Sequence, residues 1–318
     1  MTIVRNAFFT LICLLLLGSG WLPAQTVTPV AGGLTADFTT WLSANGYGSY
    51  QFQRADLIGG SYGGKQSATD TVVNEPIIFI HGNSDKALGT GEAYQSGWTA
   101  SIEYFLSKGY KSSELYATTW GPADSLLASQ QYHSKAYLTQ TRAFIQAVLA
   151  YTGAAKVNII SHSMGVTLAR KAILGGAASD LLAGGSYNLG TPLTSFIDTF
   201  VGIAGANWGL TACYTTDGST PTCANTNGLY PGYMIGPVGL ASILTNINSK
   251  SHYEGTHVYT LWSHVDEIIM YGDVVWGQYT SEIPGQNGEV TSTVYGHDQC
   301  KDLTGYNQWR MVTAHATN

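Results

Sequence analysis

The chain has 318 residues, of which 44% are hydrophobic and only 11% are charged, whereas soluble domains carry about 25% charged residues. Its 14 basic and 20 acidic residues give a formal charge of -6, so no nucleic-acid-binding surface is expected. The 8 Trp, 20 Tyr and 9 Phe argue against intrinsic disorder. Length and composition therefore predict a compact, weakly acidic protein with a single large domain.

The first 24 residues are predicted to be a signal peptide. Arg5 carries their only charged side chain, an apolar run covers 7–17, and small residues lead to an expected cleavage point after Ala24. This run is shorter than the roughly 20 residues that a membrane-spanning helix needs. We therefore expect a secreted, extracellular protein without a stable membrane span, whose mature domain covers 25–318.

Three cysteines remain in the mature chain. Cys213 and Cys223 lie ten residues apart in a loop rich in Gly, Ser, Thr and Pro. In an oxidising compartment, a disulfide between them is the simplest interpretation, and it would stabilise the fold by about 3 kcal/mol. Cys300 would then be free and buried, or it would be the true partner of one of the other two.

The pattern of the chain from Pro76 onward is a regular alternation, after a Gly-, Thr- and Ser-rich segment (25–75) that we expect to be irregular. Short continuous apolar runs indicate strands buried on both faces of a parallel sheet. The expected elements, in chain order, are strand 77–80, a helix that includes Trp98, Ile102 and Phe105, strand 115–118, helix 134–151, strand 157–160, helix 164–174, strands 200–204, 258–262 and 290–294, and a final helix with Leu303, Tyr306 and Trp309. This order predicts an α/β fold whose mostly parallel sheet is covered by helices on both faces.

One long stretch, residues 207–255, breaks this alternation. It carries Gly, Pro, Tyr, Asn, Thr and the cysteine pair. A loop of this length in a compact domain is usually functional or disordered, and its aromatic content argues against disorder. We expect a lid or a substrate-contacting insertion.

The clearest chemical signal is the segment Ser161-His162-Ser163-Met164-Gly165, which joins an apolar strand directly to a helix. This is the setting of a nucleophile elbow, a strained turn that needs small residues two before and two after the nucleophile. Ser163 meets this requirement, because Ser161 precedes it and Gly165 follows it. Ser161 replaces the first Gly of the G-x-S-x-G pattern. We therefore predict that Ser163 is the nucleophile.

A serine nucleophile needs a base, and His297 fits this role best. In this kind of fold the triad follows the order Ser, acid, His, with the His after the last strand. His297 follows the expected strand 290–294, whereas His257 lies within a strand and His315 is near the end of the last helix. His133 is interpreted as a helix-start or partly exposed residue. The side chain of His162 is expected to point toward the flank of the sheet, away from the nucleophile.

The predicted acid is Asp266, four residues past Trp262 at the carboxyl end of a predicted parallel strand. It would hold the imidazole in the correct tautomer and stabilise the imidazolium. Glu267 and Asp273 are the competing carboxylates. Asp298, next to His297, is interpreted as a surface or supporting group.

An oxyanion hole needs two backbone N–H groups, one after the nucleophile and one after an early strand. Met164 would supply the first. The second is expected from Asn83, because Gly82 in the His81-Gly82-Asn83 loop lets the backbone turn an amide inward.

These motifs together resemble the class 2 lipases. The likeness rests on H-G-N at 81–83, S-H-S-M-G at 161–165, V-D-E-I at 265–268 and G-H-D at 296–298, and it is greatest to nematode members. The cysteine-bearing insertion is also similar to that of a bacterial extracellular polyhydroxybutyrate depolymerase. The resemblance implies a secreted α/β-hydrolase with the triad Ser163, Asp266 and His297 and oxyanion amides at Asn83 and Met164.

The resulting hypothesis is a serine hydrolase, lipase or carboxylesterase, that cleaves carboxylic esters of lipids through an acyl-enzyme. It would need no cofactor and no metal, and its partner would be an ester or lipid substrate at an interface. The alternatives are a polyester (polyhydroxyalkanoate) depolymerase and a catalytically inactive secreted binding domain. Fold does not select among lipases, esterases and depolymerases.

Overall fold

The computed structural model describes residues 30–216, 218–234 and 238–318. The predicted signal peptide, residues 1–24, lies outside these described residues. Within them, no helix is both long and apolar enough to cross a membrane.

The core of the structure is a sheet of eight strands in the order β1-β2-β4-β3-β5-β8-β9-β12. Every neighbouring pair is parallel except β2 and β4, which are antiparallel. The strands of this sheet are β1 Gly33–Leu34, β2 Ser61–Gly63, β3 Ile77–Ile80, β4 Leu115–Thr118, β5 Val157–His162, β8 Ile197–Ile203, β9 His257–Ser263 and β12 Gly288–Ser292. Two small antiparallel hairpins lie outside it, formed by β6 Ala177–Asp180 with β7 Gly185–Asn188 and by β10 Val274–Val275 with β11 Gln278–Tyr279.

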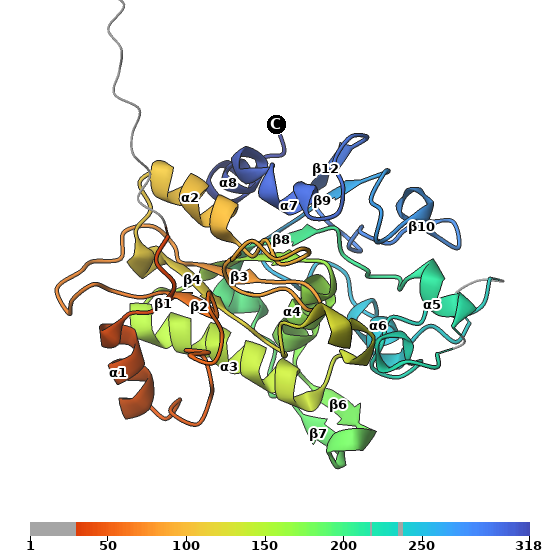
Figure 1. The fold of residues 1–318 in the computed structure, drawn as a ribbon, viewed down its shortest axis with the longest axis horizontal. Coiled ribbons are helices and arrows are strands. Elements are labelled where there is room, and N and C mark those ends of the chain that lie inside the picture. The colour runs from red at the N-terminus through yellow and green to blue at the C-terminus, as the bar shows by residue number, and fades with distance from the viewer. Residues whose placement is uncertain (1–29, 217, 235–237) are drawn as a thin grey trace, which may run out of the picture.

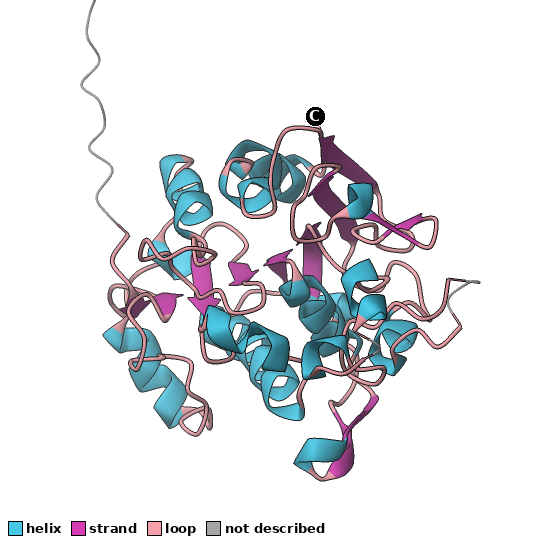
Figure 2. Ribbon diagram, turned by 45° about the vertical axis from the view of Figure 1, so that its right-hand side comes forward, coloured by secondary structure: helices cyan, strands magenta, loops and turns pink. Residues whose placement is uncertain are grey.

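Helices cover both faces of the sheet (Figures 1 and 2). In the view of Figure 1, α2, α7 and α8 lie above the sheet, and α1, α3, α4 and α6 lie below it. The α-helices are α1 Ala36–Ala44, α2 Thr99–Ser107, α3 Lys135–Thr152, α4 Met164–Leu174, α5 Thr211–Thr215, α6 Ser242–Ile247, α7 Gln299–Asp302 and α8 Gly305–Ala314. The hairpin β6–β7 projects from the lower side of the molecule in both views.

Strand β3 shows why the apolar runs in the sequence are continuous. Successive side chains of a strand point to opposite faces, and accordingly Ile78 and Ile80 belong to one hydrophobic core whereas Ile77 and Phe79 belong to the other. Both faces of β3 are covered, so all four side chains are buried. A strand between two helical layers has no solvent face to accommodate polar residues.

Most of the predicted elements are confirmed. Strands β3 and β4 and helix α4 have the expected bounds, and α3 begins one residue later than expected because Ser134 caps it, its hydroxyl accepting from Tyr137 N–H. Strands β8 and β9 begin earlier than the apolar runs, and β12 covers Gly288–Ser292 instead of 290–294. The apolar pattern marks the centre of a strand better than its ends, which pairing with neighbours determines.

The N-terminal segment is more regular than expected. The prediction of an irregular stretch over 25–75 was wrong for α1, where Thr35 caps the helix and Phe38 and Leu42 are buried. It also missed β1 and β2, whose short Gly-containing sequences carry no apolar run. Both strands extend the edge of the sheet next to β4.

The insertion over 207–255 contains α5 and α6. A disulfide links Cys213 to Cys223 within it, as predicted, and Cys300 is free and buried.

Arg170 of α4 anchors this insertion from within the core. Its guanidinium donates to Glu254 at 2.7 Å and to the Ile247 carbonyl at 2.8 Å, and the side chains of Arg170 and Glu254 have no exposed surface. A buried ion pair of this kind fixes the packing of the insertion on α4.

Candidate active site

The turn between β5 and α4 has the backbone of a nucleophile elbow. Ser163 is the single residue between these elements and adopts φ 55° and ψ −132°. A positive φ of this kind is rare for a residue with a side chain and stores strain that the surroundings must offset. The Ser163 N–H donates to the Ile203 carbonyl of β8 at 2.8 Å, which secures the turn to the sheet.

Close backbone approach explains the small residues around Ser163. A Cβ on Gly165 would lie 2.2 Å from the His81 carbonyl oxygen, and one on Gly82 would lie 2.8 Å from Ser163 Cβ. Ser161, which stands where the usual pattern has Gly, is fully buried and donates its hydroxyl to the Val201 carbonyl at 3.2 Å. The departure from the pattern is therefore accommodated by a hydrogen bond to β8.

His297 and Asp266, the predicted base and acid, are hydrogen-bonded to each other. His297 Nδ1 lies 2.7 Å from Asp266 Oδ2. Asp266 Oδ1 accepts the backbone N–H groups of Ile268 and Ile269 at 2.9 and 2.8 Å. Because an ionised carboxylate only accepts hydrogen bonds, Nδ1 carries the imidazole proton and Nε2 is left as the acceptor.

The competing carboxylates contact other partners. Asp273 is buried and accepts from the backbone N–H and the hydroxyl of Ser281 at 3.0 and 2.6 Å. Glu267 does not contact the imidazole, but its carboxylate accepts the backbone N–H of His297 at 2.9 Å. Of the three acidic candidates after β9, only Asp266 bonds the His297 ring.

A cavity of about 340 Å³ brings Ser163, His297 and Asn83 together at the carboxyl ends of the parallel strands. Exposed Tyr94 and Ile268 contribute to its wall, whereas no described residue of the insertion does. Ser163 Oγ and His297 Nε2 share no hydrogen bond among the described contacts. Such bonds are often long in ligand-free enzymes and tighten when substrate binds.

Of the two predicted oxyanion residues, Asn83 lines this cavity, and Met164 directly follows Ser163 in the chain. Met164 is the first residue of α4, so its N–H precedes the first intrahelical hydrogen bond. Asn83 lines the cavity, and its side chain is held by the Ala128 carbonyl and the Ser84 hydroxyl, both at 2.9 Å. This arrangement fixes the loop that would present the Asn83 amide.

His162 was expected to point toward the flank of the sheet and not toward the nucleophile; its side chain packs against His297 and lines the cavity. Its ring lies 4.5 Å from the His297 ring, and its Nε2 is 3.2 Å from the His297 carbonyl oxygen. A carbonyl only accepts, so Nε2 carries the proton and donates. Burial, and secondly the neighbouring His297, holds the pKa of His162 well below its usual value. His162 is therefore a neutral support for the His297 loop.

Two further histidines are buried and structural. His81 accepts the Trp120 N–H at Nε2, lies 2.7 Å from the Gly82 carbonyl through Nδ1, and has a pKa lowered to about 4 by burial. His133, interpreted as a helix-start or partly exposed residue, directly precedes the Ser134 cap of α3 and is fully buried. It connects the Asn227 carbonyl of the insertion to Thr167 of α4 at 2.8 and 2.6 Å.

Sequence reasoning missed a buried ion pair beside the cavity. Lys301 Nζ contacts Asp85 Oδ2 at 2.8 Å and the Gly97 carbonyl at 2.7 Å, and the Lys301 side chain is completely buried. Asp85 lies two residues after Asn83, and Lys301 lies four residues after His297. The only signal in the sequence was a Lys within a short segment that also carries His297.

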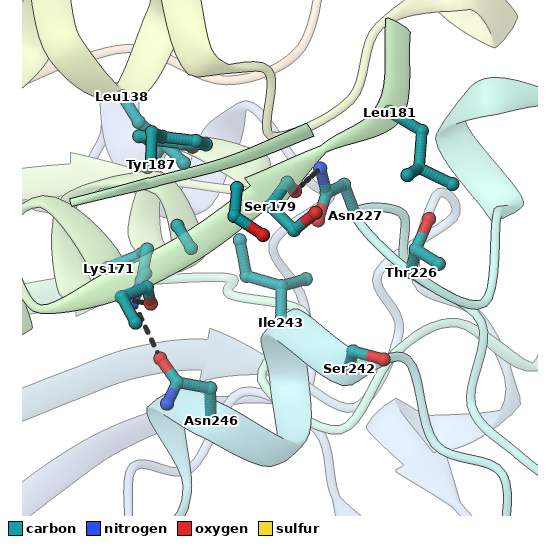
Figure 3. Close-up of a pocket in the computed structure, with 13 residues that line it drawn as sticks. Leu138, Lys171, Ser179, Leu181, Tyr187, Thr226, Asn227, Ser242, Ile243 and Asn246 are labelled. Atoms are coloured by element: carbon teal, nitrogen blue, oxygen red, sulfur yellow. Dashed lines mark hydrogen bonds between the residues drawn. The ribbon is translucent and has the colours of Figure 1, made fainter. Parts of the chain in front are cut away.

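A separate cavity of about 460 Å³ lies between the hairpin β6–β7 and α6 (Figure 3). Leu138, Tyr187 and Ile243 line it, and Lys171 donates to Asn246 Oδ1 at 2.8 Å on its wall. None of the predicted triad or oxyanion residues lines this second cavity.

The sheet, its helical layers and the strand-turn-helix at Ser163 define an α/β-hydrolase. The chain belongs to the class 2 lipase family, because the model of that family, described as "Lipase (class 2)", matches residues 74–310. It is therefore a lipase-like carboxylic ester hydrolase. No curated protein sequence gave a match.

Solved structures with a similar fold include lipases of two microorganisms. A Bacillus licheniformis lipase in its propeptide form has a TM-score of 0.51 at 11% identity, with 81% of this chain and 54% of that chain covered. The mature form of that lipase has a TM-score of 0.49 at 10% identity, with 81% of this chain and 98% of that chain covered. Lipase B of Aspergillus fumigatus has a TM-score of 0.48 at 11% identity, with 81% of this chain and 56% of that chain covered. At 11% identity, the likeness to the propeptide form shows the fold alone.

Proposed function

We propose that this protein is a secreted serine hydrolase that cleaves carboxylic esters of lipids. Ser163 is the nucleophile, His297 the general base and acid, and Asp266 the group that orients His297. The observation that carries the proposal is the 2.7 Å contact between His297 Nδ1 and Asp266 Oδ2, next to a serine with positive φ in the same cavity.

The proposed reaction has two halves. Ser163 Oγ attacks the ester carbonyl carbon while its proton passes to His297 Nε2, and the backbone N–H groups of Asn83 and Met164 stabilise the oxyanion. The ester C–O bond then breaks, the alcohol leaves with the proton from His297, and the acyl group stays on Ser163. Water attacks this acyl-enzyme and gives a proton to His297, which returns it to Ser163 as the carboxylic acid leaves.

Active-site labelling tests the assignment of the nucleophile. A fluorophosphonate probe should label the native protein, and the label should be lost in Ser163→Ala. Ser125→Ala is the matched control, because Ser125 also lines the cavity but lies outside the elbow, and it should keep the label. Undiminished labelling of the folded Ser163→Ala protein would refute the proposal.

An apolar substrate is favoured by the low charge of the chain and by exposed apolar side chains at the cavity wall, including Tyr94 and Ile268. The same features suit a polyester, which is the second candidate substrate. Hydrolysis of p-nitrophenyl esters of increasing chain length, of emulsified triglyceride and of a polyhydroxyalkanoate film distinguishes them. Preference for the emulsion supports a lipase, and preference for the film supports a depolymerase.

Secretion is proposed from the signal-peptide pattern of residues 1–24, with 25–318 as the mature hydrolase domain. The Cys213–Cys223 disulfide supports this location, because disulfides persist in oxidising compartments and are rare in the cytosol. Mass spectrometry of the protein recovered from the medium of an expressing host should find an N-terminus near Gln25. Retention of the full-length chain inside the cells would contradict it.

A further inference from the structure

Three potential metal ligands lie together at the amino ends of β8 and β9, the end of the sheet opposite the Ser163 cavity. Asp198 is the second residue of β8, His257 is the first residue of β9, and His315 directly follows α8. Ser163 and Asp266, in contrast, follow the carboxyl ends of β5 and β9. Since β5, β8 and β9 are parallel, the two groups of residues lie at opposite ends of these strands.

The ligand atoms of this group lie close together. One ligand atom from each of Asp198, His257 and His315 lies within 4.8 Å of the others. Asp198 Oδ2 is 3.0 Å from His315 Nε2 and 3.8 Å from His257 Nδ1. The two imidazole rings are stacked, with centroids 3.7 Å apart. One carboxylate oxygen thus faces one nitrogen of each ring.

The protein leaves part of this group without a hydrogen-bond partner. His257 Nδ1 is buried and has none among the described residues. Lys156 contacts Asp198 through the other oxygen, Oδ1, at 3.3 Å, and also donates to Thr256 at 2.7 Å. Oδ2 accepts from the Thr199 hydroxyl at 3.3 Å and also faces the two histidines.

We propose that Asp198, His257 and His315 form a binding site for a divalent transition metal such as Zn²⁺. Two imidazoles and one carboxylate suit Zn²⁺, which binds N and O ligands at about 2.0–2.2 Å, usually with four ligands. Water or another oxygen ligand would complete the set. The stacked rings cannot both aim a lone pair at one ion, so His315, which is 40% exposed, must turn out of the stack.

The metal would act on stability, not on ester hydrolysis. None of the three residues lines the Ser163 cavity. The ion would connect the starts of β8 and β9 to the residue after α8, a helix that packs on β8. A ligand that binds only the folded state raises its stability by mass action. Occupancy should therefore raise the unfolding temperature and leave the turnover of esters unchanged.

Equilibrium dialysis and thermal unfolding with ZnCl₂ test this site on chelator-treated mature protein. We expect one equivalent of bound zinc and a higher unfolding temperature. His315→Asn removes the most exposed ligand and should weaken zinc binding by about 100-fold or more, since changes to mere supporting residues already cost about 10–100-fold. His252→Asn is the matched control, because His252 bonds the Gly285 carbonyl instead, and it should bind zinc normally.

A second variant keeps the test decisive if a histidine variant unfolds. Lys156→Gln removes a cation from Asp198 while conserving a hydrogen-bonding side chain, so it should increase zinc affinity. Native protein that binds no zinc, or zinc binding that is unchanged in both His315→Asn and Lys156→Gln, would overturn the proposal. Adventitious binding at other sites would give that second pattern.

Discussion

Lys301 Nζ and Asp85 Oδ2 form a buried ion pair of 2.8 Å that joins the segment after His297 to the loop after Asn83. The two residues are 216 positions apart in the sequence. The pair therefore fixes the position of the proposed base, His297, relative to one proposed oxyanion donor, Asn83. Its contribution to stability can be measured directly.

Lys301→Met should destabilise the protein strongly, because it leaves the Asp85 carboxylate buried without its cation. Breaking one side of a buried pair typically costs about 3–5 kcal/mol. Lys111→Met is the control, since Lys111 contacts Asp70 in a more exposed pair and such pairs contribute about 0–1 kcal/mol. Urea unfolding measures both. Equal losses in the two variants would contradict the role given to Lys301.

Asp266→Asn should lower kcat by about 10⁴-fold, the order of effect expected when the orienting acid is neutralised and the imidazole takes the wrong tautomer. Asp273→Asn should leave kcat within a few fold, because Asp273 bonds Ser281 and not His297. Steady-state hydrolysis of a p-nitrophenyl ester measures both. If Asp273→Asn is the inactive variant, the acid has been assigned to the wrong carboxylate.

Asp273 should also make stability depend on pH. Burial raises the pKa of Asp273 from 3.8 to about 7, so between these values the folded state binds a proton that the unfolded state lacks. The contribution to the free energy of unfolding is therefore complete below pH 4 and is lost as pH rises through 7, by up to about 1.4 kcal/mol per pH unit.

Asp273→Asn should remove this part of the pH dependence. Urea unfolding of the native protein and of the variant at pH 5, 6 and 7 measures the difference in their free energies of unfolding. Other titrating groups contribute equally to both proteins, so their contributions cancel in this difference. A difference that does not vary with pH would show that Asp273 is ionised throughout this range.

We expect His162 to position His297 by donating a hydrogen bond from its Nε2 to the backbone carbonyl of His297. His162→Leu removes the donated hydrogen bond, whose net contribution of about 1 kcal/mol corresponds to a loss of up to about tenfold in kcat. His162→Asn can retain a donor and should lose less. Comparing kcat with KM checks the mechanism: a rise in KM at unchanged kcat would mean that His162 acts on substrate binding.

The central strands and the elbow were predictable because their signals are local. The apolar run at 77–80 reports burial on both faces, and the strand, Ser163 and helix follow one another within a few residues. The disulfide also joins near neighbours. Strands β1 and β2 were not predictable, since they are only two and three residues long and Gly33, Ser61 and Gly63 interrupt any apolar run, although β2 is fully buried.

The site residues also divide into those that the sequence could predict and those that it could not. A sequence order could place Ser163, Asp266 and His297 at the carboxyl ends of strands, but it could not show that Glu267 binds the backbone of His297 while Asp266 binds its ring. Adjacent residues point in different directions, and only the packed loop decides which of them meets the imidazole.

By itself, the sequence determined the α/β class and the position of the elbow, because both depend on local periodicity and on small residues around Ser163. Only the tertiary structure decided the neighbours of His162, the pairing of Lys301 with Asp85, and the convergence of Asp198, His257 and His315. These contacts join residues far apart in the chain. Their geometry depends on how strands align and helices pack, which no local pattern encodes.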